Sequence, residues 1–261
     1  MNRRDFLQTS TIAALGVSTG SLHPIGTNSD EVITKKIFLT GGGYDLNFIN
    51  YLISLTGKPK PNICFLPTPV GDSDVYIKRW YETARALPIQ PFVQKVFINA
   101  AEQTDSFENL LLDMDAILVP GGNTLNTIAL WKAQGIDIIL QKAWEKGIVL
   151  SGASAGALCW FEQGLSDSRP KELTVVEGLG FLKGSNCPHY HSEANRKETY
   201  KRFIHKGGLK PGYACDDLAG LYFENDTLTK VLSTNKENKA YKLNLIDGAV
   251  VESVIEPTLI Q

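Results

Sequence analysis

Five short apolar runs alternate with segments of helical periodicity along the first 150 residues of this chain, and this order constrains the fold more than any other feature. The expected strands are residues 36–40, 62–67, 91–98, 116–119 and 147–151. The expected helices are residues 45–55, 75–87, 106–112, 124–134 and 137–146. Apolar strands without polar alternation are typical of a sheet that is buried on both faces. The sequence therefore predicts an α/β fold with a mostly parallel sheet covered by helices on both faces.

The pattern changes after about residue 210. Short apolar runs at residues 221–223, 230–232, 240–245 and 250–255 are separated by polar turns, which predicts a small C-terminal β-meander that completes the same domain. The chain has 261 residues, of which 43% are hydrophobic and 21% charged, a balance that supports a sizeable core. We therefore expect one α/β domain over residues 31–261.

Residues 1–30 carry the pattern of an export signal. Arg3 and Arg4 are followed by Phe6 and then by a mildly apolar run at residues 11–17, the order found in twin-arginine signals. The run is too short and too polar to span a membrane as a stable helix. The predicted location is periplasmic or otherwise exported, and a cytoplasmic location is the alternative because no clear A-x-A cleavage site follows.

Charge and cysteine content limit the partners that we expect. The net charge is −2 and no basic patch dominates, so nucleic acid is not an expected partner. The four cysteines are widely spaced and form no C-x-x-C pair, so we expect no metal site, and no cofactor is predicted. The sequence leaves a homodimer open.

The strongest chemical signal is the pentapeptide Gly152-Ala153-Ser154-Ala155-Gly156, which directly follows the expected strand at residues 147–151 and precedes a helical run. A serine nucleophile in a strand–turn–helix needs small neighbours, because it occupies a tight and strained turn. Such a turn would lift the hydroxyl above the sheet edge and aim the N–H of Ala155 at a developing oxyanion. The alternative is an ordinary Gly/Ser turn. We favour Ser154 as a catalytic nucleophile.

A serine needs a base, and the histidines offer few choices. His23 lies in the expected signal segment, and His205 lies in a polar helical stretch. His189 and His191 follow Ser154 in one short segment, and we favour His189 over His191.

The acid that orients the imidazole is less constrained. Asp167 is the first candidate, Asp216 and Asp217 are the next, and Glu193 is the last.

A second oxyanion donor is expected at the end of the strand at residues 116–119. The run Pro120-Gly121-Gly122-Asn123-Thr124 closes this strand and opens a helix, so its glycines allow the backbone to approach a ligand. A helix N-terminus also favours negative charge. The alternative role of this run is helix capping by Asn123, and the two roles are compatible.

Three separated motifs also resemble a known family. Pro-Gly-Gly-Asn-Thr at residues 120–124, Ser-Ala-Gly-Ala at residues 154–157 and Cys-Pro-His at residues 187–189 occur in the order seen in the dipeptidase E and cyanophycinase family of serine peptidases. The resemblance covers residues 35 to about 225. It implies a fold similar to class I glutamine amidotransferases, with serine in place of cysteine at the sharp turn.

By this resemblance Ser154 is the nucleophile and His189 the base. Asp167 is the acid of the triad, and Gly122 and Ala155 supply the backbone N–H groups of the oxyanion hole.

The resemblance breaks down at one position that concerns substrate choice. Bacterial dipeptidase E is associated with cleavage after an N-terminal aspartate, and an arginine after a Glu-Thr pair is thought to hold the aspartate side chain. Here the corresponding residue is Tyr200, and Arg196 or Arg202 would have to substitute for that arginine. Asn123, Arg196, Tyr200 and Asp217 are therefore candidates for contacting the substrate or supporting the triad.

Three functions remain open from the sequence. The first is a serine exopeptidase that hydrolyses dipeptides through an acyl-enzyme on Ser154. The second is an esterase or amidase with the same machinery, and the third is a catalytically silent small-molecule binding protein. Retention of a nucleophile, a base and both glycine-rich turns favours an enzyme.

Overall fold

The computed structural model describes residues 33–261. The expected export signal at residues 1–30 lies outside the described residues and stays a prediction. None of the helices between residues 33 and 261 is long and apolar enough to cross a lipid bilayer.

The larger of two sheets has eight strands in the order β14-β11-β10-β1-β5-β4-β2-β3. Its strands are β1 (Lys36–Thr40), β2 (Asn62–Phe65), β3 (Gln90–Val93), β4 (Ala116–Val119), β5 (Val149–Ala153), β10 (Ala219–Glu224), β11 (Thr227–Ser233) and β14 (Thr258–Leu259). The block β1-β5-β4-β2-β3 is parallel throughout, and β10 joins it antiparallel to β1. Because these five strands run the same way, their carboxyl ends lie along one edge, where ligands of such sheets bind.

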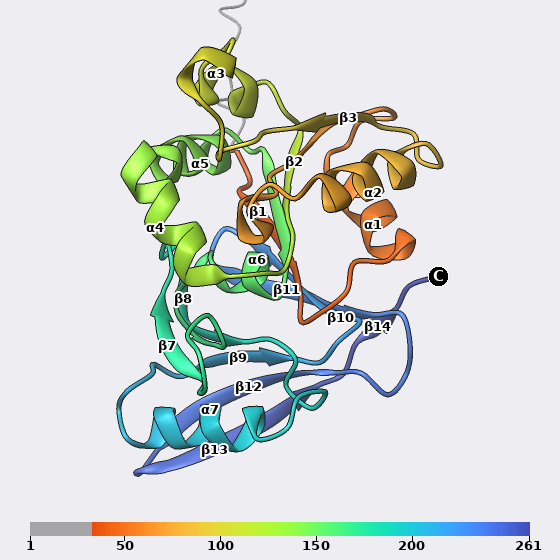
Figure 1. The fold of residues 1–261 in the computed structure, drawn as a ribbon. Helices are drawn as coiled ribbons and strands as arrows, with labels where there is room; N and C mark the ends of the chain where they lie inside the picture. The colour runs from red at the N-terminus through yellow and green to blue at the C-terminus, as the bar shows by residue number, and fades with distance from the viewer. Residues whose placement is uncertain (1–32) are drawn as a thin grey trace, which may run out of the picture. The chain divides into compact units, whose positions relative to one another are not determined.

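Helices cover both faces of this sheet, as expected (Figure 1). They are α1 (Leu46–Leu55) and α2 (Asp74–Ala84) on one side, and α3 (Phe107–Leu112), α4 (Thr124–Gln134) and α5 (Ile136–Glu145) on the other. Two short 3₁₀ turns, Thr68–Val70 and Ala100–Glu102, lie in the connections. The side chains of Phe48 and Leu52 on α1 pack with Phe38 and Ile63 of the sheet, whereas Trp131 on α4 packs on the opposite face.

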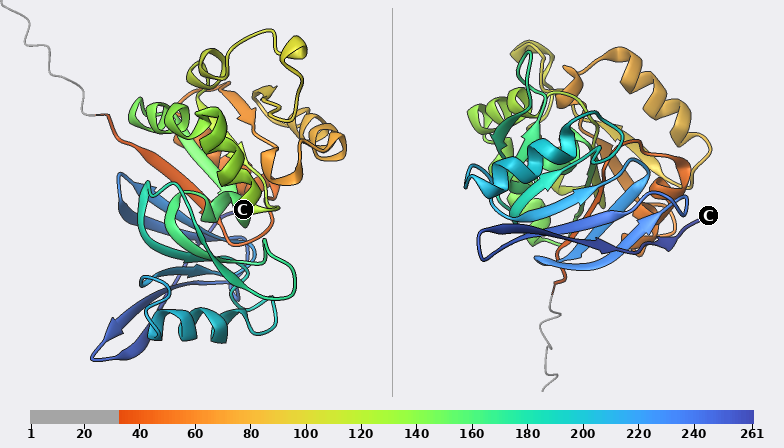
Figure 2. Two further views of the ribbon diagram at one scale, coloured as in Figure 1. Left: turned by 60° about the vertical axis from the view of Figure 1, so that its left-hand side comes forward. Right: turned by 90° about the horizontal axis from the view of Figure 1, so that it is seen from below.

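The second sheet has six strands in the order β13-β12-β9-β8-β6-β7 (Figure 2). Its strands are β6 (Phe161–Ser166), β7 (Thr174–Glu177), β8 (Leu182–Cys187), β9 (Gly212–Cys215), β12 (Ala240–Ile246) and β13 (Ala249–Ile255). Helix α7 (Arg196–His205) packs on it through Tyr200 and Ile204, which share a core cluster with Tyr241 and Leu243. The strands β6, β8 and β9 are mutually parallel, so their carboxyl ends also lie together.

The structure confirms the α/β class, and it also shows where the sequence pattern was incomplete. The expected C-terminal strands are present, but they are divided between the two sheets. Strands β6, β7, β8, β9 and the two-residue β14 were not expected. In β8 the reason is that the inner part of the strand is polar. Its Ser185 and Asn186 are buried, and a hydrogen bond between the Ser185 and Tyr200 hydroxyls (2.7 Å) replaces contact with water at Ser185.

Candidate active site

Ser154 occupies the sharp turn between β5 and the short helix α6 (Ala155–Leu158). Its backbone has φ +53° and ψ −113°, a conformation that non-glycine residues rarely adopt and that costs about 1–3 kcal/mol. The flanking glycines are required by packing. A Cβ at Gly152 would collide with the carbonyl of Gly156, and a Cβ at Gly156 would collide with the carbonyl of Val119 at the end of β4. The local sequence therefore dictates this turn, as expected.

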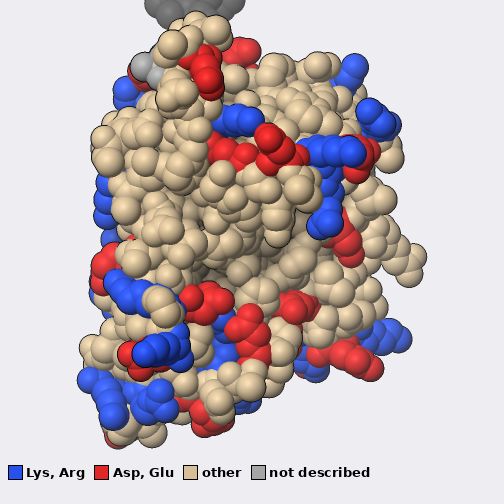
Figure 3. All heavy atoms as spheres, viewed as in Figure 1, with Lys and Arg blue, Asp and Glu red and all other residues tan. Residues whose placement is uncertain are grey.

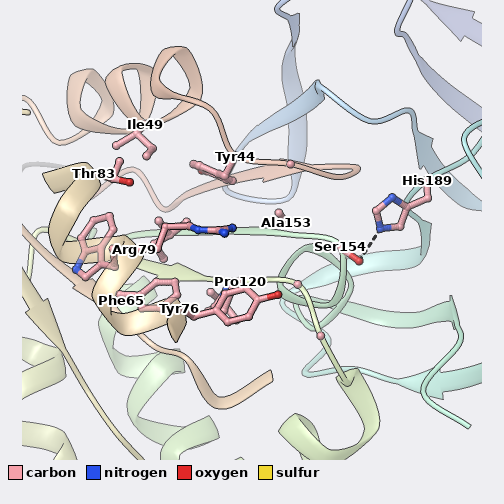
Figure 4. A pocket seen from close by; sticks show the side chains of 16 residues that line it. Tyr44, Ile49, Phe65, Tyr76, Arg79, Thr83, Pro120, Ala153, Ser154 and His189 are labelled. Carbon is pink, nitrogen blue, oxygen red and sulfur yellow. Dashed lines mark hydrogen bonds between the residues drawn. The ribbon is translucent and has the colours of Figure 1, made fainter. Parts of the chain in front are cut away.

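His189 lies beside the nucleophile. It follows β8, and its Nε2 is 2.8 Å from the Ser154 Oγ, the dashed contact in Figure 4. Its backbone also has a positive φ, +55°. Only 20% of its side chain is exposed, so the ring has little freedom to leave this position. The structure therefore brings together the two residues that the sequence pairs as nucleophile and base.

The carboxylate that contacts His189 belongs to Asp217. Its Oδ1 is 2.6 Å from the His189 Nδ1, the ring atom that faces away from Ser154. Asp217 follows β9, which pairs in parallel with β8, and the Tyr190 N–H donates to the Cys215 carbonyl (3.1 Å) to tie the two strand ends together. A hydrogen-bonded line therefore runs from Ser154 through His189 to Asp217.

Asp167, the acid expected first, does not reach His189, so this expectation is corrected. Asp167 follows β6, the neighbour of β8 on the side opposite β9. Its side chain is 69% exposed, and its described charged contact is to the Arg196 guanidinium at 4.0 Å. Both neighbours of β8 thus carry an aspartate near their carboxyl ends. Only the pairing of strands decides which aspartate meets the imidazole.

The remaining acid and base candidates form their own pairs. The His191 Nδ1 is 2.8 Å from Asp216, which also accepts a hydrogen bond from the Tyr241 hydroxyl (3.0 Å). Glu193 pairs with Arg196 at 2.5 Å. None of these contacts involves Ser154. The His205 Nδ1 is 3.0 Å from the Gly248 carbonyl, away from the site.

Two backbone amides border Ser154 from different elements. Ala155 opens α6. Gly122 lies three residues beyond the end of β4 and has φ +142°, and a Cβ there would collide with the Pro69 carbonyl. Gly121 lies so close that a Cβ there would be 3.2 Å from the Ser154 Cβ. Within residues 33–261 the amides of Gly122 and Ala155 donate to no protein acceptor, so both are available to an anion.

Asn123 caps the adjacent helix, as one of its two expected roles requires. Its side-chain oxygen accepts from the Asn126 N–H (2.9 Å), and its Nδ2 donates to the Ser168 carbonyl (3.0 Å). The oxygen and the nitrogen of the Asn123 side chain are therefore both used to position α4 and the Gly121-Gly122 turn before it.

Gly42 is a site residue that the sequence reasoning missed. It follows β1, and a Cβ there would collide with the Asp217 carboxylate and the His189 ring. Its carbonyl accepts from the Leu218 N–H (2.9 Å), which holds the Asp217 segment against β1. The Gly-Gly-Gly run at residues 41–43, after an apolar strand, was the signal in the sequence for a close approach to the backbone. It does not reveal which side chains make that approach.

A cavity of about 490 Å³ opens from Ser154 and His189 along the face covered by α1 and α2. Its walls include Tyr44, Ile49, Phe65, Tyr76, Arg79 and Trp80 (Figure 4). Phe65 and Trp80 stack with their rings 5.6 Å apart. Burial raises the pKa of the Tyr44 hydroxyl, so that group stays neutral. The sequence pattern did not predict this cavity, because its walls come from segments that lie far apart in the chain.

A smaller depression borders Ser154 on another side. It is lined by Gly122, Ala155, Asp167, Pro188 and Arg196. Arg196 is 1% exposed, and its guanidinium is held by Glu193 and by the Leu165 carbonyl (3.2 Å).

The other two substrate candidates lie elsewhere. The Tyr200 hydroxyl is buried against Ser185, and Arg202 lines a separate cavity with Thr199 and Phe203.

Between residues 33 and 261 no group of three or more His, Cys, Asp or Glu side chains is placed to hold a metal ion. The four cysteines are buried, and burial raises the pKa of the Cys64 thiol to about 12, which keeps it protonated.

Comparison with known proteins adds an independent line of evidence. The sequence model of peptidase family S51 matches residues 14–231. The uncharacterized peptidase YgaJ of Bacillus subtilis (strain 168) is 41% identical over 224 residues, which cover 84% of this chain and 96% of that protein.

Two solved structures share the fold at 17% identity. A peptidase from an acI-B1 actinobacterium has a TM-score of 0.67 and covers 88% of this chain and 98% of its own. A putative peptidase E protein from Listeria monocytogenes EGD-e has a TM-score of 0.57, with 77% and 100% covered. The match to the family over most of the chain, together with the 41% identical relative, shows that this chain belongs to peptidase family S51.

Proposed function

We propose that this peptidase is a serine exopeptidase that hydrolyses dipeptides through an acyl-enzyme on Ser154. The observation that carries the proposal is the continuous hydrogen-bonded line from the Ser154 Oγ to His189 (2.8 Å) and from His189 to Asp217 (2.6 Å). Nucleophile, base and orienting acid in this relation recur in serine hydrolases of unrelated folds.

Each group has one task in the proposed reaction. The Ser154 Oγ attacks the scissile carbonyl carbon while His189 Nε2 takes its proton, and the Gly122 and Ala155 N–H groups stabilise the oxyanion. His189 then donates the proton to the leaving amine as the C–N bond breaks. Water attacks the resulting ester in the same way and releases the acid. Asp217 accepts from Nδ1–H and thereby keeps Nε2 free to act as the base.

An esterase or amidase would use the same groups, so the substrate must be determined by experiment. A dipeptide library, supplemented with matched esters and amides, should show turnover of dipeptides by the full chain. Turnover of esters alone, with no dipeptide cleaved, would contradict the exopeptidase proposal. Absence of all turnover and of labelling by an active-site probe would instead favour a binding protein.

Asp217→Asn should lower kcat by about 10³-fold while leaving the fold intact. The amide would donate to Nδ1 and so stabilise the tautomer that protonates Nε2. The expected loss of kcat is smaller than the loss for a fully buried triad acid, because the Asp217 side chain is 40% exposed. The measurement is kcat and KM on one dipeptide, with thermal melting to confirm folding.

Asp167→Asn is the matched control for this change, since it removes the other aspartate that ends a neighbour of β8. We expect its kcat to stay within about threefold of wild type, because its exposed carboxylate does not touch His189. A larger loss for Asp167→Asn than for Asp217→Asn would reassign the orienting acid.

A neutral first residue should be accepted at least as well as aspartate. Binding an aspartyl side chain would require an unpaired cation near the acyl side of Ser154. Arg196 borders that side, but Glu193 pairs with it at 2.5 Å and Asp167 lies 4.0 Å away, so a third carboxylate would be repelled. We expect kcat/KM for Asp-Leu to be no greater than for Ala-Leu. A preference for Asp-Leu above about 100-fold that is lost in Arg196→Gln would show that Arg196 binds substrate.

A further inference from the structure

We propose that Arg79 binds the C-terminal carboxylate of the substrate, so that the large cavity selects the free C-terminal residue of a dipeptide. The inference rests on the proposed peptidase function. It adds which chemical group of the substrate binds on the leaving-group side of the site.

The position of His189 identifies which side that is. In an acyl transfer the base must return its proton to the leaving amine, so the leaving group lies where both nucleophile and base are within reach. Ser154 and His189 both line the large cavity, whereas the smaller depression is bordered by Ser154, Ala155 and Pro188 without the imidazole. The amine-bearing residue of the substrate therefore belongs in the large cavity.

The lining of that cavity suits an apolar residue with one negative charge. Ile49, Phe65 and Trp80 offer apolar contact for a side chain. None of the described residues that line the cavity is acidic, and Arg79 supplies its guanidinium. Figure 3 shows the hollow in this face, largely without charged side chains, with charged groups around it.

No carboxylate of the described residues compensates the charge of Arg79. Within residues 33–261 its contact is with the ring of Tyr76, 5.9 Å from the guanidinium carbon, and no carboxylate pairs with it. On the same helix Lys78 approaches Glu82 (3.9 Å). Figure 4 shows the Arg79 side chain extended into the cavity on the side of Tyr44 and Ala153.

The chemistry of a dipeptide places an anion in this region. In a dipeptide the free carboxylate is attached to the Cα next to the leaving nitrogen, only one residue from the bond that Ser154 attacks. A guanidinium can bind such a carboxylate through two parallel hydrogen bonds. Arg79 would thus favour dipeptides over longer peptides or C-terminal amides.

The test compares Ala-Leu with Ala-Leu amide, which differ only in the terminal charge. Arg79→Gln should lower kcat/KM for Ala-Leu by about 10- to 100-fold and change it for the amide by less than about threefold. Arg79→Lys should restore part of the loss, since it keeps the charge without the fork geometry. Arg85→Gln is the matched control, because it lies at the end of the same helix but lines a different cavity. It should leave both substrates unchanged.

Equal losses on both substrates, or no loss on either, would overturn the proposal. If wild type hydrolysed neither substrate, the proposed function would fail separately, and binding would then decide about Arg79. Calorimetric titration of Ser154→Ala with Ala-Leu should show affinity that is at least about 10-fold weaker when Arg79→Gln is added. Unchanged affinity in that double variant would overturn the carboxylate site.

Discussion

Ser154→Ala should lower kcat by about 10⁵-fold or more while the protein remains folded. The change removes the oxygen that forms the acyl-enzyme, and the remaining amides of Gly122 and Ala155 can only stabilise attack by water. The fold should tolerate alanine, since the turn is set by the packing of Gly152 and Gly156 rather than by the hydroxyl. Steady-state kinetics on a dipeptide, with thermal melting as the test of folding, would measure both expectations.

A fluorophosphonate probe gives a readout that does not depend on the substrate. It should label one residue in wild type and none in Ser154→Ala. Ser192→Ala is a suitable control, because Ser192 is exposed in the segment that follows His189. It should keep full labelling and activity. Activity and labelling that persisted in Ser154→Ala would place the nucleophile elsewhere.

His189→Ala should lower kcat by about 10⁴-fold or more, whereas His191→Ala should lower it by less than about 10-fold. The Nε2 of His189 contacts the nucleophile at 2.8 Å, so its loss leaves the Ser154 hydroxyl without a base. His191 contacts Asp216 instead, at 2.8 Å, and its loss weakens one tie between neighbouring segments. The two variants remove the same side chain from positions two residues apart.

KM distinguishes a chemical role from a structural one. His189→Ala should reduce kcat with KM changed by less than about threefold, because the ring acts on the proton rather than holding the substrate. It should also abolish labelling by the fluorophosphonate, since the serine is no longer activated. A greater kcat loss in His191→Ala than in His189→Ala would transfer the role of base to His191.

The sequence by itself determined the features that local order dictates. Unalternated apolar runs between helical segments are typical of a sheet buried on both faces, so a parallel block of strands was predictable, but the order of its strands was not. The turn at Ser154 was also predictable from local sequence. Only glycine fits at positions 152 and 156, where a Cβ would collide with the carbonyls of Gly156 and Val119 respectively. His189, Gly122 and Ala155 were identified by motif and order. The structure places His189 in contact with Ser154, and Gly122 and Ala155 line a depression that Ser154 borders.

Only the tertiary structure decided which groups meet across the strands. Asp167 and Asp217 each follow a strand next to β8, and the sequence contains nothing that ranks β6 against β9 as the source of the acid. The cavity with Arg79 and the close approach of Gly42 were hidden for the same reason. Hydrogen bonds and packing between segments far apart in the chain depend on strand order and register, which are set by the burial of whole sheets and leave no local pattern.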